Sequence, residues 1–206
     1  MRRLVIIGAS GFGREIAWII KRMNAVFPQF ELLGFSDDAA DKQSGLCGAY
    51  PLLGRIEEAA GCGAEFFFCA IGSNRARQAV TDRAVAVGLQ PVTVIDPSAI
   101  VAPDAVIGDG GYIGIGSVVS AGARLGAGVI VNHQVTVGHD VEIGNFAQLC
   151  PGVRVSGGCK VGEGALLGSN ACTIPGVRIG AWATVGAGAA ALRDVVECGS
   201  VLRFNR

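Results

Sequence analysis

Aromatic side chains are scarce in this sequence, at 6% of its 206 residues, and histidine occurs only twice, although half of the residues are hydrophobic. This scarcity excludes a core of bulky rings, and the 32 glycines favour many tight turns. The formal net charge is zero, so no face need be strongly basic and a nucleic-acid partner is not expected. No apolar run approaches the roughly 18 residues that span a bilayer, and the N-terminal apolar run is too short for a signal peptide. We therefore expect a cytoplasmic protein with no membrane partner.

The seven cysteines also exclude two common frameworks. Their number is odd, and no C-x-x-C pair occurs. A disulfide-stapled domain and a cysteine zinc cage are therefore not expected, and no metal is predicted.

Residues 95–190 form an internal repeat. Read in sixes from Ile95, they make 16 unbroken hexads whose first position is Ile, Val or Leu, with Thr173 the one exception. The fifth position is always Ala, Gly, Ser, Val or Cys. Three such hexads make one triangular coil, in which first-position aliphatics stack inward and fifth-position small residues fill the space near the axis. The repeat predicts an all-β left-handed parallel β-helix of about five turns.

The residues before the repeat read as a small α/β unit. Residues 3–8 predict a buried parallel strand that runs through the glycine turn GASGFG (8–13) into a helix. The turn can present backbone N–H groups to a phosphate, although its order is G-x-x-G-x-G and not the dinucleotide pattern. A second strand over 30–38 ends on Asp37 and Asp38. A third strand over 66–72 leads into Ser73, Asn74 and Arg77 at the same sheet edge. We predict a Rossmann-like domain over residues 1–92 that binds a mononucleotide-sized ligand, followed by the β-helix over 93–206.

The two histidines lie at the third positions of adjacent hexads, where side chains near a corner can point outward. His139 is followed by Asp140, and imidazole is the side chain best suited to accept a proton near neutral pH. An amine that attacks a thioester must lose a proton, so His139 is the candidate general base, with Asp140 orienting it. Glycine-rich backbone N–H groups could stabilise the thioester oxyanion.

Together, the glycine turn, the Asp pair and the run N-H-x(5)-H-D-x-x-I-G resemble the bacterial family of sugar-nucleotide N-acetyltransferases and sialic acid O-acetyltransferases. The resemblance covers residues 1–195. It implies a homotrimer with active sites between neighbouring coils, acetyl-CoA along the coil, and His139 with Asp140 as the catalytic pair. The nucleotide-sugar positions that it implies are Gly8, Ser10, Gly11, Gly13, Asp37, Asp38, Gly72 and Asn74. The acetyl-CoA positions are His133, Gln148, Gly157, Ser169, Gly186, Ala187 and Gly188.

The predicted function is acetyl transfer from acetyl-CoA to the amino group, at carbon 4, of a nucleotide-linked deoxyamino sugar. Three alternatives remain open. O-acetylation of sialic acid or a related sugar would use the same fold. A zinc carbonic anhydrase also uses such a coil, but it needs three histidine ligands. A non-catalytic nucleotide-binding scaffold would leave His139 dispensable. Trimer formation has a physical basis as well, because Val, Ile, Ala and Cys at outward places leave surface to bury by threefold closure.

Overall fold

The structure is a computed structural model that describes residues 1–39 and 45–202. Two compact units divide between Pro97 and Ser98, whereas the sequence placed the boundary between residues 92 and 93. Asp96 stays with the first unit because Arg22 of its first helix binds the buried Asp96 carboxylate through two hydrogen bonds of 2.6 and 3.1 Å. Within the described residues, no helix combines the length and the apolar character that crossing a membrane requires.

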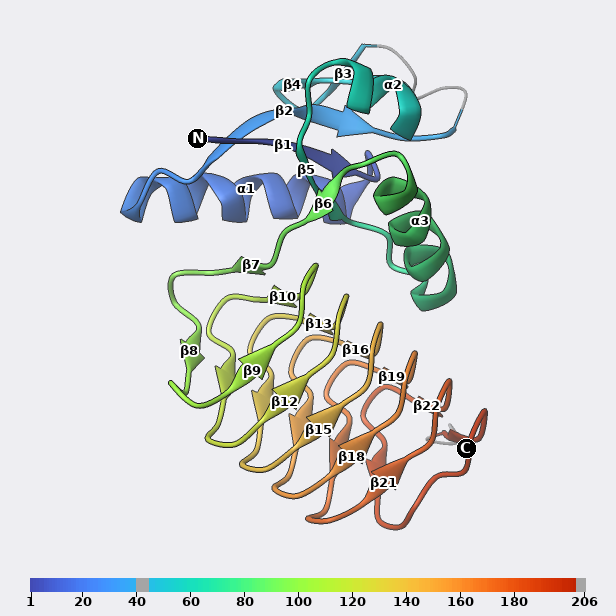
Figure 1. Cartoon of the computed structure of the whole chain (residues 1–206). Coiled ribbons are helices and arrows are strands. Elements are labelled where there is room, and N and C mark those ends of the chain that lie inside the picture. Colours follow the sequence, from blue (N-terminus) through green and yellow to red (C-terminus); the bar gives the residue numbers. More distant parts are fainter. Residues whose placement is uncertain (40–44, 203–206) are drawn as a thin grey trace. The chain divides into compact units, whose positions relative to one another are not determined.

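The first unit is built on a four-stranded parallel sheet in the order β2-β1-β5-β6 (Figure 1). Its strands are β1 (Arg2–Ile7), β2 (Phe30–Ser36), β5 (Phe66–Cys69) and β6 (Gln90–Pro91). The apolar run 4–7 of β1 is at most 2% exposed, as expected for a parallel strand covered on both faces. The predicted α/β unit is confirmed.

Among the described residues, three helices accompany this sheet. They are α1 (Gly11–Val26), α2 (Ile56–Gly61) and α3 (Asn74–Ala86). Val5 and Ile7 pack with Ile56 of α2 and Ala84 of α3 in one core. The sequence did not predict α2, nor the short hairpin of β3 (Leu46–Cys47) and β4 (Tyr50–Pro51). The first unit closes with β7 (Val94–Ile95).

The second unit is the predicted parallel β-helix, which is confirmed (Figure 1). Within residues 98–202, the strands of its first sheet are β10 (Tyr112–Ile113), β13 (Ile130–Val131), β16 (Gln148–Leu149), β19 (Leu166–Leu167), β22 (Thr184–Val185) and β24 (Ser200–Val201). The second sheet holds β8 (Ile100–Val101), β11 (Val118–Val119), β14 (Thr136–Val137), β17 (Arg154–Val155), β20 (Cys172–Thr173) and β23 (Ala190–Ala191). The third holds β9 (Val106–Ile107), β12 (Arg124–Leu125), β15 (Glu142–Ile143), β18 (Lys160–Val161) and β21 (Arg178–Ile179).

Each coil strand pairs with the strand one turn later. Tyr112 pairs with Ile130, and Arg124 with Glu142, so the period is 18 residues, or three hexads. The last turn is tighter, because Arg178 meets Asp194 at a spacing of 16 residues and Thr184 pairs with Ser200. First-position side chains from 113 to 185 are at most 6% exposed, so the predicted inward ladder is confirmed. Burial of each aliphatic member stabilises the coil by about 1.5–3 kcal/mol.

Three corners separate the sheets. We call the corner between the first and second sheets (residues 132–135 in one turn) the first corner. The second corner (138–141) joins the second and third sheets, and the third corner (144–147) leads back to the first. From residue 110 to residue 188, the fourth residue of each hexad takes the left-handed backbone conformation, which is easy for glycine. Several other residues also adopt it, with φ of 55–58°: Gln134, Asp140, Phe146, Asn170 and Trp182.

Candidate functional site

The glycine turn of the first unit depends on close backbone approach. Gly8 has φ of 108°, and a β-carbon there would lie 2.8 Å from the carbonyl oxygen of Ala70 at the end of β5. A β-carbon at Gly13 would lie 2.1 Å from the Gly8 carbonyl oxygen. Gly13 therefore lets α1 pack directly against the end of β1, and Gly8 lets the chain after β1 approach the end of β5.

A cavity of about 280 Å³ lies at the carboxyl ends of β1, β2 and β5. Five of the eight residues predicted for the nucleotide sugar line it: Gly8, Ser10, Asp37, Asp38 and Gly72. Gly11, Gly13 and Asn74 are not among its lining residues. Apolar side chains complete the lining, including Ile56 of α2 and Val80 of α3. This combination of convergent polar groups and an apolar wall is typical of a small-molecule site.

The two aspartates at the end of β2 have different partners. Asp37 accepts the backbone N–H of Ala9, in the glycine turn, at 2.9 Å through Oδ2 and the N–H of Ala39 at 3.0 Å through Oδ1. Asp37 therefore ties the turn after β1 to the end of β2. Asp38 instead turns toward α3.

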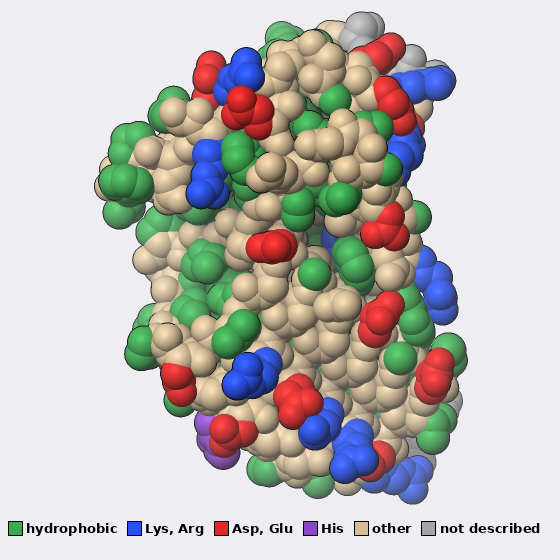
Figure 2. All heavy atoms as spheres, viewed as in Figure 1, with side chains coloured by type: hydrophobic (Ala, Val, Ile, Leu, Met, Phe, Trp, Pro, Cys, Tyr) green, Lys and Arg blue, Asp and Glu red, His purple; other side chains and the backbone are tan. Residues whose placement is uncertain are grey.

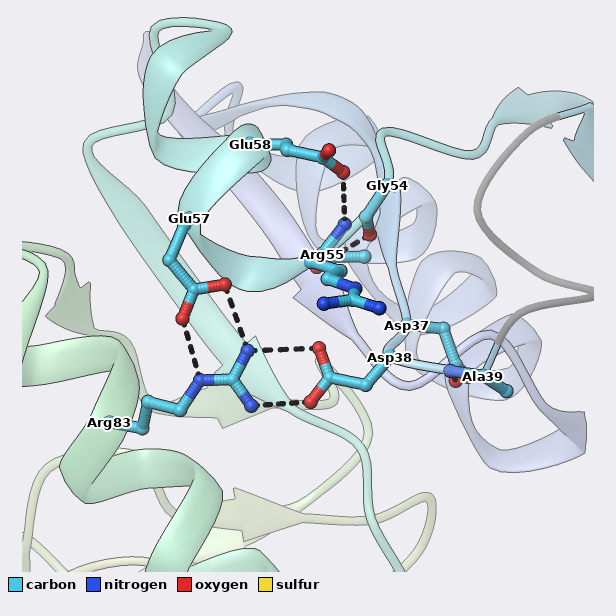
Figure 3. A network of polar contacts seen from close by, with 9 residues as sticks. Asp37, Asp38, Ala39, Gly54, Arg55, Glu57, Glu58 and Arg83 are labelled. Atoms are coloured by element: carbon cyan, nitrogen blue, oxygen red, sulfur yellow. Dashed lines mark hydrogen bonds and ion pairs between the residues drawn. The ribbon is translucent and has the colours of Figure 1, made fainter.

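Figure 3 shows Arg83 of α3 between two carboxylates. Its guanidinium donates to both oxygens of Asp38, at 2.9 Å for one of them, and to both oxygens of Glu57 at 2.8 and 2.9 Å. The Arg83 guanidinium lowers the pKa of Glu57 to about 2. The network joins the end of β2 to α2 and α3, all of which line the cavity. Sequence reasoning missed Arg83 and Glu57, because neither lies in a recognisable motif.

Asn74 and Arg77 stabilise the turn between β5 and α3. Arg77 is 1% exposed, and its guanidinium donates to the Ile71 carbonyl at 3.0 Å and to Asn74 Oδ1 at 3.2 Å. Burial lowers the pKa of Arg77 to about 10. In this structure the Asn74 side chain thus holds the turn that carries Gly72.

On the coil, His139 and Asp140 form a pair at the second corner. His139 Nδ1 lies 2.9 Å from Asp140 Oδ2. Because a carboxylate only accepts hydrogen bonds, the ring carries its proton on Nδ1 and presents the Nε2 lone pair. In a single chain the two side chains are 72% and 73% exposed. The geometry is that of a base with a carboxylate orienter.

Gly157 lies directly beneath this base, one turn further along. A β-carbon at 157 would be 2.5 Å from His139 Nε2 and 2.7 Å from Cε1. The Gly158 N–H donates to the His139 carbonyl at 2.9 Å, which fixes the two turns against each other. A side chain at 157 would therefore displace the imidazole from this position.

His133 lies at the first corner, and the hydrogen-bonding roles of its two ring nitrogens are the reverse of those in His139. Its Nδ1 accepts the Ile115 N–H at 3.2 Å, so the neutral ring carries its proton on Nε2. The corner is further held by Ser117, whose buried hydroxyl donates to the Asn132 carbonyl at 2.6 Å and accepts the Val135 N–H at 3.1 Å. The two histidines therefore differ in both position and hydrogen-bonding character.

Most of the predicted acetyl-CoA positions lie along the first corner. His133, Ser169 and Ala187 occupy the same third position in different turns, and backbone bonds connect the column, such as Gly188 N–H to Ser169 carbonyl at 2.8 Å. Gly186 and Gly188 flank Ala187, and Gln148 lies on β16, which leads into this corner. Gly157 is the exception, since it lies at the second corner beneath His139.

The third sheet carries a groove that the sequence did not suggest. It encloses about 500 Å³ over a row of second-position glycines, and its outward side chains are Arg124, Glu142, Lys160 and Arg178. Figure 2 shows basic and acidic side chains gathered on this face of the coil. Among the described residues, no group of three or more His, Cys, Asp or Glu side chains is placed to hold a metal ion.

Comparison with known proteins identifies the family. Residues 3–84 match the PglD N-terminal domain. The acetyltransferase domain of PglB from Neisseria gonorrhoeae, solved with acetyl coenzyme A, is 30% identical, with 98% of this chain and 96% of that chain covered and a TM-score of 0.87. PerB from Caulobacter crescentus, solved with CoA and GDP-perosamine, is 31% identical, with 98% and 95% covered and a TM-score of 0.90.

A third structure, WeeI from Acinetobacter baumannii, shares the fold at 23% identity and a TM-score of 0.88 over 98% of this chain and 97% of that one. No curated protein matches the chain. Because two structures at 30% and 31% identity match over nearly the whole length of both chains, the protein is an acetyltransferase and belongs to the hexapeptide-repeat family with a PglD N-terminal domain.

Proposed function

We propose that this acetyltransferase moves the acetyl group of acetyl-CoA to the amino group, at carbon 4, of a nucleotide-linked deoxyamino sugar, with His139 as general base. The observation that carries the proposal is the hydrogen bond between His139 Nδ1 and Asp140 Oδ2, which leaves Nε2 as an acceptor at a coil corner. The likeness to PerB, solved with CoA and GDP-perosamine, supports the choice of substrates.

The proposed mechanism follows from these roles of the two ring nitrogens, with Nδ1 as donor and Nε2 as acceptor. The sugar amine attacks the thioester carbonyl carbon, and His139 Nε2 takes the proton that the nitrogen loses as the C–N bond forms. When the tetrahedral intermediate collapses, the C–S bond breaks and the proton passes to the departing CoA sulfur. Asp140 stabilises the imidazolium that forms between the two steps. The Gly157 N–H supplies a donor for the oxyanion, whereas the N–H groups of Ser156 and Gly158 donate within the coil.

The cavity of the first unit is the proposed nucleotide site. Gly8 and Ser10 present the glycine turn to the diphosphate, at the start of α1 where the helix dipole favours a negative charge. Asp37 and Asp38 line the same cavity and offer acceptors for the nucleoside. Ile56 of α2 gives an apolar surface on which a base packs.

The proposed base and the proposed acetyl-CoA column lie at different corners of one coil. His133 and His139 are six residues apart, so about 20 Å of extended chain at most separates their corners. The second sheet lies between them. A second copy of the chain, whose first corner adjoins the second corner of this one, completes the site in our proposal. The exposure of His139 in a single chain supports it, because catalytic groups work best shielded from water.

The second sheet lies between the two corners, and in our proposal it is the face that meets another coil. Its outward side chains are Ile100, Val118, Thr136, Arg154, Cys172 and Ala190. The only charged one, Arg154, donates its guanidinium hydrogens to the backbone carbonyls of Gly152 and Val153. The third sheet, by contrast, carries four charged side chains. Threefold closure through the second sheet, which has a single charged outward side chain, gives the homotrimer that we propose.

Measurement of CoA release tests the proposal. Acetyl-CoA is offered with UDP- and GDP-linked 4-amino sugars and with free sialic acid, to wild type, His139→Ala and Asn145→Ala. Asn145 is an exposed third-position residue at the next corner and serves as the control. We expect turnover on an amino sugar that falls about 10² to 10⁴-fold in His139→Ala and persists in Asn145→Ala. Turnover on sialic acid alone would replace the N-acetyl proposal with O-acetylation, and full activity of His139→Ala would refute the assigned base.

A further inference from the structure

Thr173 interrupts the aliphatic ladder of the coil at one place. It is the one first-position residue of the hexads that is not Ile, Val or Leu. Thr173 is nevertheless buried, with 6% of its surface exposed. Together with Ser117 it is one of two buried polar residues in the described part of the coil. A buried hydroxyl is expected to be hydrogen-bonded, so its partners identify what it does.

Ser156 donates two hydrogen bonds to Thr173 in the adjacent turn. The Ser156 N–H donates to Thr173 Oγ1 at 3.0 Å, and the Ser156 hydroxyl donates to the Thr173 carbonyl at 2.6 Å. Cys159, which is fully buried, lies with its sulfur 3.2 Å from Thr173 Oγ1 and donates to the Ile174 carbonyl at 3.2 Å. These side chains form a closed polar cluster inside the coil.

These contacts replace a regular backbone–backbone hydrogen bond between adjacent turns. In the other turns of the same face the second-position N–H donates straight to a backbone carbonyl one turn later. Two examples are Ser120 to Val137 at 3.0 Å and Gly138 to Val155 at 2.8 Å. At Ser156 a side-chain oxygen takes that place. The strand pairing reflects the change, because β17 and β20 pair only through Arg154 and Cys172.

The changed hydrogen bonding at Ser156 lies next to the proposed catalytic base. Ser156 precedes Gly157, over which the His139 imidazole lies. The Gly157 carbonyl is held from the other side by the Gly176 N–H at 3.0 Å. Two hydrogen bonds therefore set the position of Gly157 relative to the base. Thr173 Oγ1 accepts the N–H of the preceding residue, Ser156, and the Gly176 N–H donates to the Gly157 carbonyl.

We infer that Thr173 and Ser156 are positioning residues for acetyl transfer. They hold the backbone of Gly157 where the His139 imidazole can lie against it in its productive position. The inference rests on the proposed function, because it needs His139 to be the base. Neither side chain touches substrate; both act through the backbone of residues 156 and 157. A displacement of about 1 Å at such a place reduces turnover by up to about 10²-fold.

The test compares Thr173→Val, which keeps the shape and removes the hydroxyl, with Thr173→Ser, which restores it. We expect kcat to fall about 5- to 50-fold in Thr173→Val, with both KM values within about twofold, and to recover in Thr173→Ser. Ser120→Ala is the matched control, because Ser120 occupies the same face but its N–H bonds directly to backbone. Val161→Ala, at an equally buried place on the third sheet, controls for lowered thermal stability alone.

Wild-type kcat in Thr173→Val, with only the melting temperature lowered, would overturn the inference. If Thr173→Val fails to fold, Ser156→Ala replaces it, since it removes, from a half-buried place, the hydroxyl that donates to the Thr173 carbonyl. A kcat loss there supports the inference and wild-type kcat refutes it. His139→Ala, run beside these variants, separates the two claims: activity in His139→Ala refutes the proposed base, whereas its loss together with an unchanged Thr173→Val refutes only the positioning role.

Discussion

The imidazole of His139 lies directly against Gly157: a β-carbon at 157 would be 2.5 Å from Nε2. The neighbouring Gly158 has the opposite character. Its backbone is in the left-handed region at φ of 67°, but a β-carbon there meets no atom within 4 Å. One glycine is required by the space around it and the other by its backbone.

This contrast gives a matched pair of variants. Gly157→Ala is expected to displace the His139 ring and lower kcat by about 10²-fold or more, because the base loses its productive position. Gly158→Ala is expected to lower stability by about 1 kcal/mol through left-handed strain and to spare kcat. Steady-state kinetics and thermal unfolding of both variants check the prediction. Equal effects on kcat would show that corner strain, and not contact with the base, matters.

Asp140→Asn tests the carboxylate partner of the base. Asparagine keeps the side-chain shape and tolerates the left-handed φ of 55° that Asp140 adopts, but it removes the charge that stabilises the imidazolium. We expect kcat to fall about 10- to 1000-fold. The melting temperature should hardly change, because exposed ion pairs contribute little to stability. Unchanged kcat would mean that His139 works without Asp140.

Arg83→Met tests whether the ionic network shapes the nucleotide cavity. Loss of the guanidinium frees Asp38 and Glu57 and loosens three elements that line the cavity. We therefore expect KM for the nucleotide sugar to rise about 2- to 10-fold, as for the loss of one or two exposed pairs, with KM for acetyl-CoA unchanged. Arg3→Met, which breaks the exposed pair with Glu65 in the same unit, is the control. A rise in both KM values in both variants would indicate general destabilisation.

The pKa of Glu57 predicts how this network responds to acid. The folded pKa is about 2, below the ordinary value of 4.5, because Arg83 donates to the carboxylate. A depressed pKa contributes stability that is present above about pH 4.5 and is lost as the pH falls toward 2. Glu57→Gln should therefore lose less melting temperature than wild type between pH 4.5 and pH 2. The difference will be small since the side chain is half exposed, and parallel melting curves would refute it.

The sequence alone determined the coil, because the information for it is local and repeated. Each hexad carries its own inward aliphatic and its own small fifth residue, and 16 copies in one register allow only one periodic structure. The glycine turn and the position of Asp37 at the carboxyl edge of the sheet could be predicted from the sequence for the same reason, because a strand-turn-helix signal spans few residues. The pattern also marked Thr173 as an exception, though it offered no reason for it.

Only the tertiary structure decided how the non-periodic side chains meet. Arg83 joins Asp38 across 45 residues and Glu57 across 26, and no local signal specifies such a pair. The helix α2, which supplies Glu57, has six residues, too few for a recognisable period. Partnerships of this kind depend on the packing of whole elements.

The histidines show both sides of this division. The partner of His139 follows it in the chain, so the sequence could predict that Asp140 orients the ring. The partner of His133 is the Ile115 N–H, 18 residues away, and only the stacking of the coil brings that N–H to Nδ1. A periodic sequence specifies the coil, while the chemistry at each corner is set by the few residues that break the period.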